Sequence, residues 1–510
     1  MSRFTPIALG LALPVSFVSQ AALADLAPAD VWGDWRSYME DMGYELSATE
    51  TPNGDDLTVS DIALSFAAPD GTGSMNLTMD RVEFRQNADG TVAVVLPDSM
   101  PIRMTGTDSA NSDEDFSMLM TYSQSGHALT ASGDPEAMTY LYTAATAALD
   151  MTQMQMGGET QSAENATVSF EATNINSSTT MTLGDMRAYQ QAGSVETVSY
   201  SFAFTDPEMP ASQGAVTGSV EGLSFTGTGS IPMNVEPGAD MALMLDAGFD
   251  VNGTLSYMSG SSNFDIKDPE NGDYVMATSS QGGDLGVKMS SDGLAYDVKQ
   301  RDVTIAVTAA EMPFPFEIAM AENGFNLAVP VSQSDDPQDF ALGVTLRDFT
   351  MSDMIWGIFD PSAQLPRDPA TVLVDLRGTV KLLVDYLNPE MAEQMDEVPG
   401  ELKSVNLSNL LVSAAGAQLD GSGAITFDGA ADGLVPGSGN PVGDVNLSLA
   451  GGNALIDKLV AMGLLPAEQA MGARMMIGLF AVPGDAPDTL KSRIEFTADG
   501  QILANGQRIR

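Results

Sequence analysis

Cysteine is absent from this chain of 510 residues, and histidine occurs only once, at His127. These absences exclude zinc sites built on histidine and cysteine ligands, and they exclude redox pairs of cysteines. No disulfide can form, so the fold must be held by burial of a core, which a chain of this length can supply. A Ser-His-Asp triad would need His127, but no Gly-x-Ser-x-Gly motif accompanies it. We interpret His127 as a surface or strand-end residue at a hairpin.

Basic residues are scarce, with 21 lysines and arginines against 69 aspartates and glutamates, which gives a formal net charge of −48. Such a charge repels phosphate backbones and anionic membrane surfaces, so we expect no nucleic-acid partner. We interpret the charge as a solvated acidic coat that maintains solubility, and the alternative is an acidic recognition surface. A hydrophobic fraction of 44% argues against a chain that is disordered throughout.

Long apolar runs are also missing, apart from an interrupted stretch over residues 4–18 that follows Arg3. This stretch is too short to anchor the chain in a bilayer, and a small-x-small motif ending at Ala24 comes after it, as is typical of a secretory signal peptide. The sequence therefore predicts a signal peptide over residues 1–24 and cleavage between Ala24 and Asp25. We expect a periplasmic mature protein with no transmembrane anchor. The alternative is that this segment is an ordinary buried element.

What the sequence has in abundance is alternation of apolar and polar residues with a period of two. Such alternation indicates strands with one buried and one solvated face, which antiparallel sheets tolerate better than parallel ones. Dipeptides that suit tight turns separate many of these segments, because glycine and asparagine adopt positive φ at low cost. The alternating segments include residues 116–122, 198–204, 241–251, 314–320, 325–329 and 340–346, and the turn dipeptides begin at Asn53, Asp70, Asp89, Asn271, Asp292, Asn323, Asp499 and Asn505.

In four segments the alternation slips by one residue, at Asp61, near Asp80, at Asp348 and at Asn409. A slip of one residue turns all later apolar side chains to the other face of a strand, unless a bulge or short turn absorbs it. We therefore predict kinks at these positions that coil a long sheet. The alternative is coincidence in a chain that is rich in aspartate and in strands.

Helical signals are few. Helices are predicted over residues 31–42, capped by Asp30, over residues 136–149, opened by Asp134 and Pro135, over a short segment from Ser352 to residue 359, and over residues 453–462 and 467–480. The predicted fold class is therefore mainly β, within the α+β class. We expect a large antiparallel sheet, elongated and curled, with a few peripheral helices.

Domain organisation is only weakly marked. A boundary near residues 330–340 would divide the mature chain into an N-terminal β-rich region over residues 25–335 and a C-terminal β-rich region over residues 336–510, which contains the predicted helical pair. The alternative is one continuous domain over residues 25–510, because no polar loop is long enough to require a break.

No residues stand out as a catalytic or metal-binding set. Carboxylates are so abundant that no glycosidase-type pair can be singled out. Residues 113–115 and 268–273 could hold calcium weakly, but neither follows the spacing of a known calcium loop. Met151, Met154 and Met156 have the pattern of a thioether copper(I) motif, and the alternative is a helix end. We therefore assign no catalytic, cofactor-binding or metal-binding residue.

Two parts of the sequence resemble a known family. The first is Asp30-Val31-Trp32 followed by Trp35, and the second comprises residues 421–427, 441–447, 453–465 and 505–509. Together they resemble the proteobacterial family known as domain of unknown function 2125, over nearly the whole mature chain. More loosely, the Gly-x-Gly-x-Ile-x-Phe strand and the Val-x-Leu-x-Leu strand that follows it are similar to AsmA-like envelope proteins.

The resemblance to AsmA-like proteins implies a long curled antiparallel sheet with an apolar groove, associated with lipid handling between two membranes. The N-terminal membrane anchor typical of that group has no counterpart here, so a bridging role does not carry over. We expect a non-enzymatic periplasmic binding or lipid-handling accessory protein whose methionine-rich groove accepts varied chains. The alternatives are an envelope structural or assembly factor that binds another protein, and a glycan hydrolase, which would need two converging buried carboxylates.

Overall fold

The computed structural model describes residues 26–67, 73–108, 116–156, 159–162, 165–233, 235, 241–310, 312, 314–388, 400–429 and 438–509. The expected signal peptide, with its cleavage site between Ala24 and Asp25, lies outside these described residues. The acidic run over residues 113–115 also lies outside them.

Strands make up most of the described chain, and five helices accompany them. The N-terminal strands are β1 (Glu45–Asn53), β2 (Asp56–Ala67), β3 (Gly73–Gln86), β4 (Val92–Val95), β5 (Ser99–Asp108), β6 (Phe116–Ser125), β7 (Ala128–Asp134), β8 (Ala137–Met156) and β9 (Glu159–Ser162). The central strands are β10 (Ala166–Leu183), β11 (Met186–Thr205), β12 (Gln213–Pro232), β13 (Asp250–Tyr257), β14 (Ser259–Lys267), β15 (Tyr274–Ser280), β16 (Gly283–Ser290), β17 (Gly293–Ala309), β18 (Phe316–Val329) and β19 (Gln338–Met351). The C-terminal strands are β20 (Ala370–Leu382), β21 (Gly400–Ala414), β22 (Ala417–Asp428), β23 (Asn440–Ala450), β24 (Val482–Pro483), β25 (Thr489–Phe496), β26 (Ile502–Ala504) and β27 (Gln507–Arg508). The helices are α1 (Pro28–Asp41), α2 (Met241–Asp246), α3 (Asp353–Phe359), α4 (Gly452–Ala461) and α5 (Ala467–Phe480).

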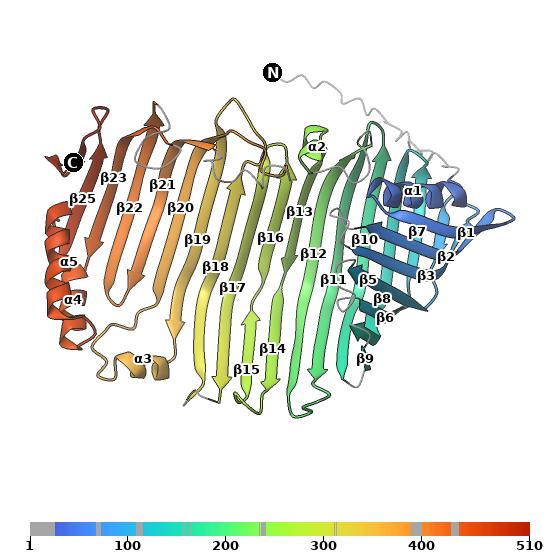
Figure 1. The fold of residues 1–510 in the computed structure, drawn as a ribbon, viewed down its shortest axis with the longest axis horizontal. Helices are drawn as coiled ribbons and strands as arrows, with labels where there is room; N and C mark the ends of the chain where they lie inside the picture. The colour runs from blue at the N-terminus through green and yellow to red at the C-terminus, as the bar shows by residue number, and fades with distance from the viewer. Residues whose placement is uncertain are drawn as a thin grey trace, which may run out of the picture.

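These strands form one continuous antiparallel sheet, which confirms the predicted mainly β fold class. Figure 1 shows the long strands from β10 to β25 side by side along the length of the molecule, with α4 and α5 at one end. At the other end the sheet curls, so that β1, β2 and β3 run across the long strands beside α1 (Figure 1). The sheet continues through residues 330–340, because β18 pairs with β19 from Ile318–Met351 to Ala328–Ala341.

A line of residues with positive φ crosses the long strands. Asn174 in β10, Gly222 in β12, Gly282 between β15 and β16, Asp302 in β17 and Asp348 in β19 all have this conformation. The pairing of neighbouring strands aligns these positions. Each of them lies between two pairs of directly opposed residues, and these pairs follow one another from strand to strand. We call this line the bulge seam.

The bulge seam keeps the apolar side chains on one face of the sheet. In β11, Tyr189 and Val195 are odd-numbered apolar residues before the seam, whereas Tyr200 and Phe202 are even-numbered ones after it. The parity changes at the same point on the neighbouring strands β10 and β12, where Asn174 and Gly222 have positive φ, so the register between the strands is kept.

The predicted slips coincide with such irregularities. Asp61 and Asp348 have φ values of 51° and 52°, and the register shifts between Leu407 and Leu410, on either side of Asn409. Near Asp80, β3 changes its partner from β5 to β4. Three of these four positions are therefore confirmed as local kinks, and the fourth marks a change of partner.

The best-packed part of the molecule is the curled N-terminal end. Here Val31 and Trp32 of α1 pack with Val59 of β2, Phe84 of β3 and Met181 of β10, all of which are buried. The rings of Trp32 and Trp35 lie 6.0 and 5.5 Å from that of Phe84. The side chains that form this core come from strands far apart in the sequence, because the curl of the sheet brings β2 and β3 opposite β10.

A buried ion pair fixes α1 to the sheet. Arg187 of β11 is 1% exposed and pairs with Asp34 of α1, while its Nη2 donates to Ser37 Oγ at 3.0 Å. Tyr140 of β8 donates its hydroxyl to the other oxygen of Asp34 at 2.8 Å. Burial raises the pKa of Tyr140, and the nearby carboxylate of Asp34 raises it further. The phenol therefore stays protonated and remains a donor at any physiological pH.

Two of the secondary-structure predictions are wrong. The segment predicted as a helix over residues 136–149 belongs to strand β8 from Ala137 onward, and the carboxylate of Asp134 caps the hairpin turn before it by accepting the N–H of Glu136 at 3.1 Å. Backbone pairing with β7 and β10 outweighs the helical propensity of this alanine-rich segment. Residues 241–251, predicted as a strand, begin as helix α2, and strand β13 starts only at Asp250.

Smaller differences concern turns and helix ends. The dipeptide Asn323–Gly324 lies inside β18, because both of its neighbours pair with this stretch. Helix α1 begins at Pro28, and Asp30 accepts the Ala27 N–H at 2.9 Å from within the first turn. Helix α5 has the predicted bounds, and α3 and α4 agree to within one residue.

Candidate functional site

The candidate site is one face of the long sheet. Direct cross-strand partners form an unbroken apolar row on it, because partners opposite each other project to the same side. The row runs from strand β12 to strand β21 through Phe225, Leu255, Leu285, Val298, Phe325, Val344, Val374 and Leu410. We call this side of the sheet the apolar face. Helix α1 lies on it, because Arg187 and Tyr189, which contact α1, occupy the same side of β11 as Gly193, the partner of Phe225.

The middle of the apolar face is uncovered. Leu285 and Phe325 are 37% and 43% exposed, and Phe204, farther along the same face, is 55% exposed. In the part of the chain that the structure describes, no helix or strand covers these side chains. Contiguous exposed apolar side chains of this kind mark interaction sites in soluble proteins.

Methionines concentrate on the apolar face near its N-terminal end. Met104 of β5 is opposite Met118 of β6, which is opposite Met154 of β8, and Met120 is opposite Met151. Met151 and Met154 therefore lie on a strand, so the alternative of a helix end is wrong. Their neighbours on this face are also methionines and aliphatic residues, and methionine adapts its shape to whatever packs on it.

A small polar cluster interrupts the apolar face at the bulge seam. The hydroxyl groups of Tyr257 and Ser280 lie 2.9 Å apart. Gln300 Nε2 donates to Tyr257 Oη at 3.3 Å, and Asn323 Nδ2 donates to Gln300 Oε1 at 3.4 Å. All four side chains are uncharged hydrogen-bonding groups. They could contact ester or hydroxyl groups of a bound molecule but offer no charge to a phosphate or carboxylate.

Helix α5 lies over the C-terminal end of the apolar face and leaves a pocket beneath it. The pocket has a volume of about 280 Å³ and is lined by Leu419, Leu447, Leu449, Met476, Ile477, Phe480, Ala481, Leu490, Lys491 and Ser492. Leu419, Leu449 and Leu490 are direct cross-strand partners, so they belong to the apolar face. The outer side of α5 is apolar as well, with Met471 70% and Met475 72% exposed.

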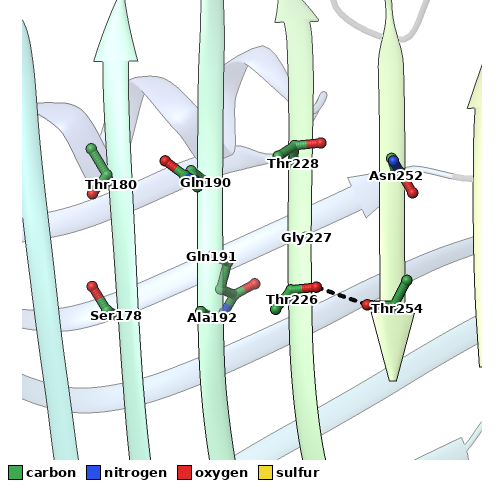
Figure 2. Close-up of a pocket in the computed structure, with 10 residues that line it drawn as sticks. All are labelled: Ser178, Thr180, Gln190, Gln191, Ala192, Thr226, Gly227, Thr228, Asn252 and Thr254. Atoms are coloured by element: carbon green, nitrogen blue, oxygen red, sulfur yellow. Dashed lines mark hydrogen bonds between the residues drawn. The ribbon is translucent and has the colours of Figure 1, made fainter. Parts of the chain in front are cut away.

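The opposite face of the sheet is polar. A shallow pocket of about 450 Å³ lies on this side. Figure 2 shows its lining residues, most of which carry hydroxyl or amide groups. Thr226 and Thr254 share a hydrogen bond of 2.7 Å there, and Ser178 and Thr180 project from β10, on the other side of β11 (Figure 2). Hydroxyl groups in this arrangement form hydrogen bonds with one another across the strands, so this face suits contact with water.

Catalytic geometry is not found among the described residues. The buried carboxylates there are Asp34, which pairs with Arg187, and Asp360, which accepts the N–H groups of Gln364 and Leu365 at 2.9 and 2.8 Å. They belong to distant elements and do not converge, as a glycosidase pair would have to. Burial alone would raise the pKa of Asp360, but the two N–H groups together with the charges of Arg367 and Lys458 outweigh it, so the pKa is lowered.

The other sequence candidates have structural roles. His127 lies between β6 and β7, which continue in one direction along β8 rather than forming a hairpin, and its Nε2 is 3.2 Å from the carbonyl of Leu96. Asp268 accepts the N–H groups of Glu270 and Asn271 at 2.8 and 3.0 Å, so it closes a turn. No group of three acidic, histidine or cysteine residues with metal-binding geometry occurs among the described residues.

No helix in the described ranges is both long and apolar enough to cross a membrane. No family model matches the chain, and no curated protein matches it. Among solved structures, the chain is similar to the crystal structure of BauA, the ferric preacinetobactin receptor from Acinetobacter baumannii. The sequence identity is 9%, the match covers 90% of this chain and 76% of that chain, and the TM-score is 0.16. A TM-score this low carries no argument about function, and the resemblance to the family of unknown function and to AsmA-like proteins stays a prediction.

Proposed function

We propose that this protein is a non-enzymatic, periplasmic lipid-handling protein that binds acyl chains along its apolar face. The observation that carries the proposal is the uncovered row of cross-strand apolar partners, in which Leu285 and Phe325 remain 37% and 43% exposed. A protein that did not use this surface would be more stable if other elements covered the apolar side chains, because apolar area left in water contributes nothing to stability.

The shape of the surface favours a long, flexible, uncharged chain. The apolar row crosses many strands, whereas the polar interruption at Tyr257 and Gln300 is uncharged. The methionines near β6 and β8 provide a lining that adapts to chains of different shape. The high negative charge elsewhere in the molecule keeps such an apolar surface soluble.

A matched pair of variants tests the proposal. Phe325→Glu places a charge on the apolar face, and Asn326→Glu places the same charge one residue away on the polar face. We expect saturable binding of a fluorescent fatty acid with a conjugated polyene chain. Affinity should fall at least roughly tenfold, about 1.4 kcal/mol, in Phe325→Glu and stay unchanged in Asn326→Glu. Native mass spectrometry should show co-purified lipid. A clean protein that takes up no acyl chain would refute the proposal.

A second candidate is an assembly factor that binds another protein through α5. Its support is the outer side of this helix, where Met471, Met475 and Leu479 are all more than half exposed. The chain's net charge of −48 opposes docking of this helix on anionic membranes, so a protein groove is the better-suited partner. Crosslinking in cells should yield one stoichiometric partner that the double variant Met471→Glu, Met475→Glu loses while fatty-acid binding persists. Retention of the partner by that variant would exclude this role of α5.

A further inference from the structure

The pocket under α5 differs from the rest of the apolar face because α5 lines one side of it and the sheet lines the other. Ile477 and Phe480 of α5 lie above Leu449 and Leu490 of the sheet. Its two polar lining residues already have partners, since Ser492 Oγ donates to the Phe480 carbonyl at 2.6 Å and Lys491 pairs with Asp485. The remaining lining is hydrocarbon and thioether.

The size and chemistry of the pocket restrict its occupant. A volume of about 280 Å³ is just below the usual range for small-molecule pockets, about 300–1,000 Å³. It is too small for a helix, which is about 10 Å across. A carboxylate or phosphate placed there would lose its hydration without gaining a partner, which is strongly unfavourable. The methyl end of a hydrocarbon chain meets both restrictions.

We propose that the pocket under α5 holds the methyl end of an acyl chain whose remaining length lies along the apolar face. This inference rests on the proposed lipid-handling function and adds a direction to it. The chain's polar end points away from α5, toward the central strands of the sheet.

Photo-crosslinking on the unmodified protein tests the direction. Two fatty acids of equal length are compared, one with a diazirine at the methyl end and one with a diazirine next to the carboxyl group. Mass spectrometry of the digested protein should place the methyl-end crosslinks within residues 476–492 and the carboxyl-end crosslinks on the central strands. If both probes crosslink the same strands, or if the pattern is reversed, the inference is overturned while fatty-acid binding itself stands. Absence of any saturable binding would overturn the inference and the proposed function together.

A filled pocket gives an independent test. Ala481 has extended backbone angles of −125° and 155°, which accept a larger side chain without strain, so Ala481→Phe should fill the cavity. Met475→Phe is the control, because it changes the outer side of the same helix. We expect methyl-end crosslinks at α5 to fall at least roughly tenfold in Ala481→Phe and to persist in the control. An unchanged crosslink pattern in a folded Ala481→Phe protein would contradict the inference.

Discussion

Helices α1 and α5 lie on the same face of one sheet, at its opposite ends, yet they are packed very differently. Helix α1 buries Val31 and Trp32 against the curled strands and is held by the ion pair between Asp34 and Arg187. Helix α5 buries only Ala470 fully, covers a pocket, and exposes its methionines. Aromatic rings and a buried charge pair specify a single arrangement, whereas methionine accepts several. The comparison suggests that α1 is a structural cap and α5 is part of a binding site.

Breaking the attachment of α1 should have the largest effect. Arg187→Met leaves the carboxylate of Asp34 buried without its cation, which costs about 3–5 kcal/mol in the free energy of unfolding. Urea denaturation of the purified protein measures this cost. The control is Arg377→Met, which removes an exposed pair with Asp375 and should cost less than about 1 kcal/mol. Equal effects of the two substitutions would show that α1 is no more firmly held than a surface loop.

A matched pair of leucines measures the difference in cover along the apolar face. Leu57 in β2 is 6% exposed, whereas Leu285 in β16 is 37% exposed. Leu57→Ala should cost about 2–5 kcal/mol of stability, and Leu285→Ala less than about 1 kcal/mol. The order should be reversed for fatty-acid binding, which Leu285→Ala should weaken more than Leu57→Ala. If both lose equal stability, the central face is covered in solution and cannot be a free binding surface.

Much of this architecture follows from local patterns in the sequence. Alternation at 198–204 and 340–346 predicted strands correctly, and the slips at Asp61 and Asp348 predicted kinks, of which the one at Asp348 belongs to the bulge seam. The wrong helix over 136–149 shows the limit. Its proline, acidic cap and alanines favour a helix locally, but pairing with β10, which follows it in sequence, decides the outcome.

The site was less predictable than the fold. The sequence indicated a methionine-rich apolar groove but could not show which part of it lacks cover. Exposure of Leu285 depends on how far α1 and α5 reach over the sheet, which no local pattern encodes. The pocket under α5 was likewise not predictable, because Leu419, Leu449 and Phe480 come together only after two strands and a helix have packed. The methionine content of residues 471–476 was the available signal.

Kinks with positive φ occur in both regions, at Asp61 in β2 and at Asp348 of the bulge seam, so substitutions at the two positions should have equal effects. Asp61 and Asp348 have φ near 50°, a region that β-branched residues rarely adopt. Asp61→Val and Asp348→Val should each cost about 1–3 kcal/mol, whereas Asp→Gly at either position should cost little. Thermal unfolding followed by circular dichroism measures both pairs. A large cost at only one of the two positions would mean that the kinks, and not only the cover, differ between the two regions.

The smallest expected effect concerns the charge that fixes α4 beside α5. Asp488 accepts the N–H of Ala454 at 2.9 Å and that of Asn453 at 3.1 Å, at the start of α4. The hydrogen bond from Ala454 is the main reason that the pKa of Asp488 is lowered from its ordinary value of 3.8. A lowered pKa means that the folded state favours the charged form, so the stabilisation is present above that ordinary value and is lost as the pH falls through the lower folded value. Asp488→Asn keeps the shape of the cap without its charge.

We therefore expect Asp488→Asn to cost about 0.3–1 kcal/mol at pH 7 and progressively less as the pH falls below 3.8, measured as the difference in urea midpoint from the unmodified protein. Because α4 supports α5, the variant should also weaken methyl-end crosslinking at pH 7. Asp89→Asn is the control, since the lowered pKa of Asp89 arises in a turn far from α5 through its bond to Thr91. An equal loss of crosslinking in both variants would show that α4 does not position α5, and that the pocket is held open by the sheet alone.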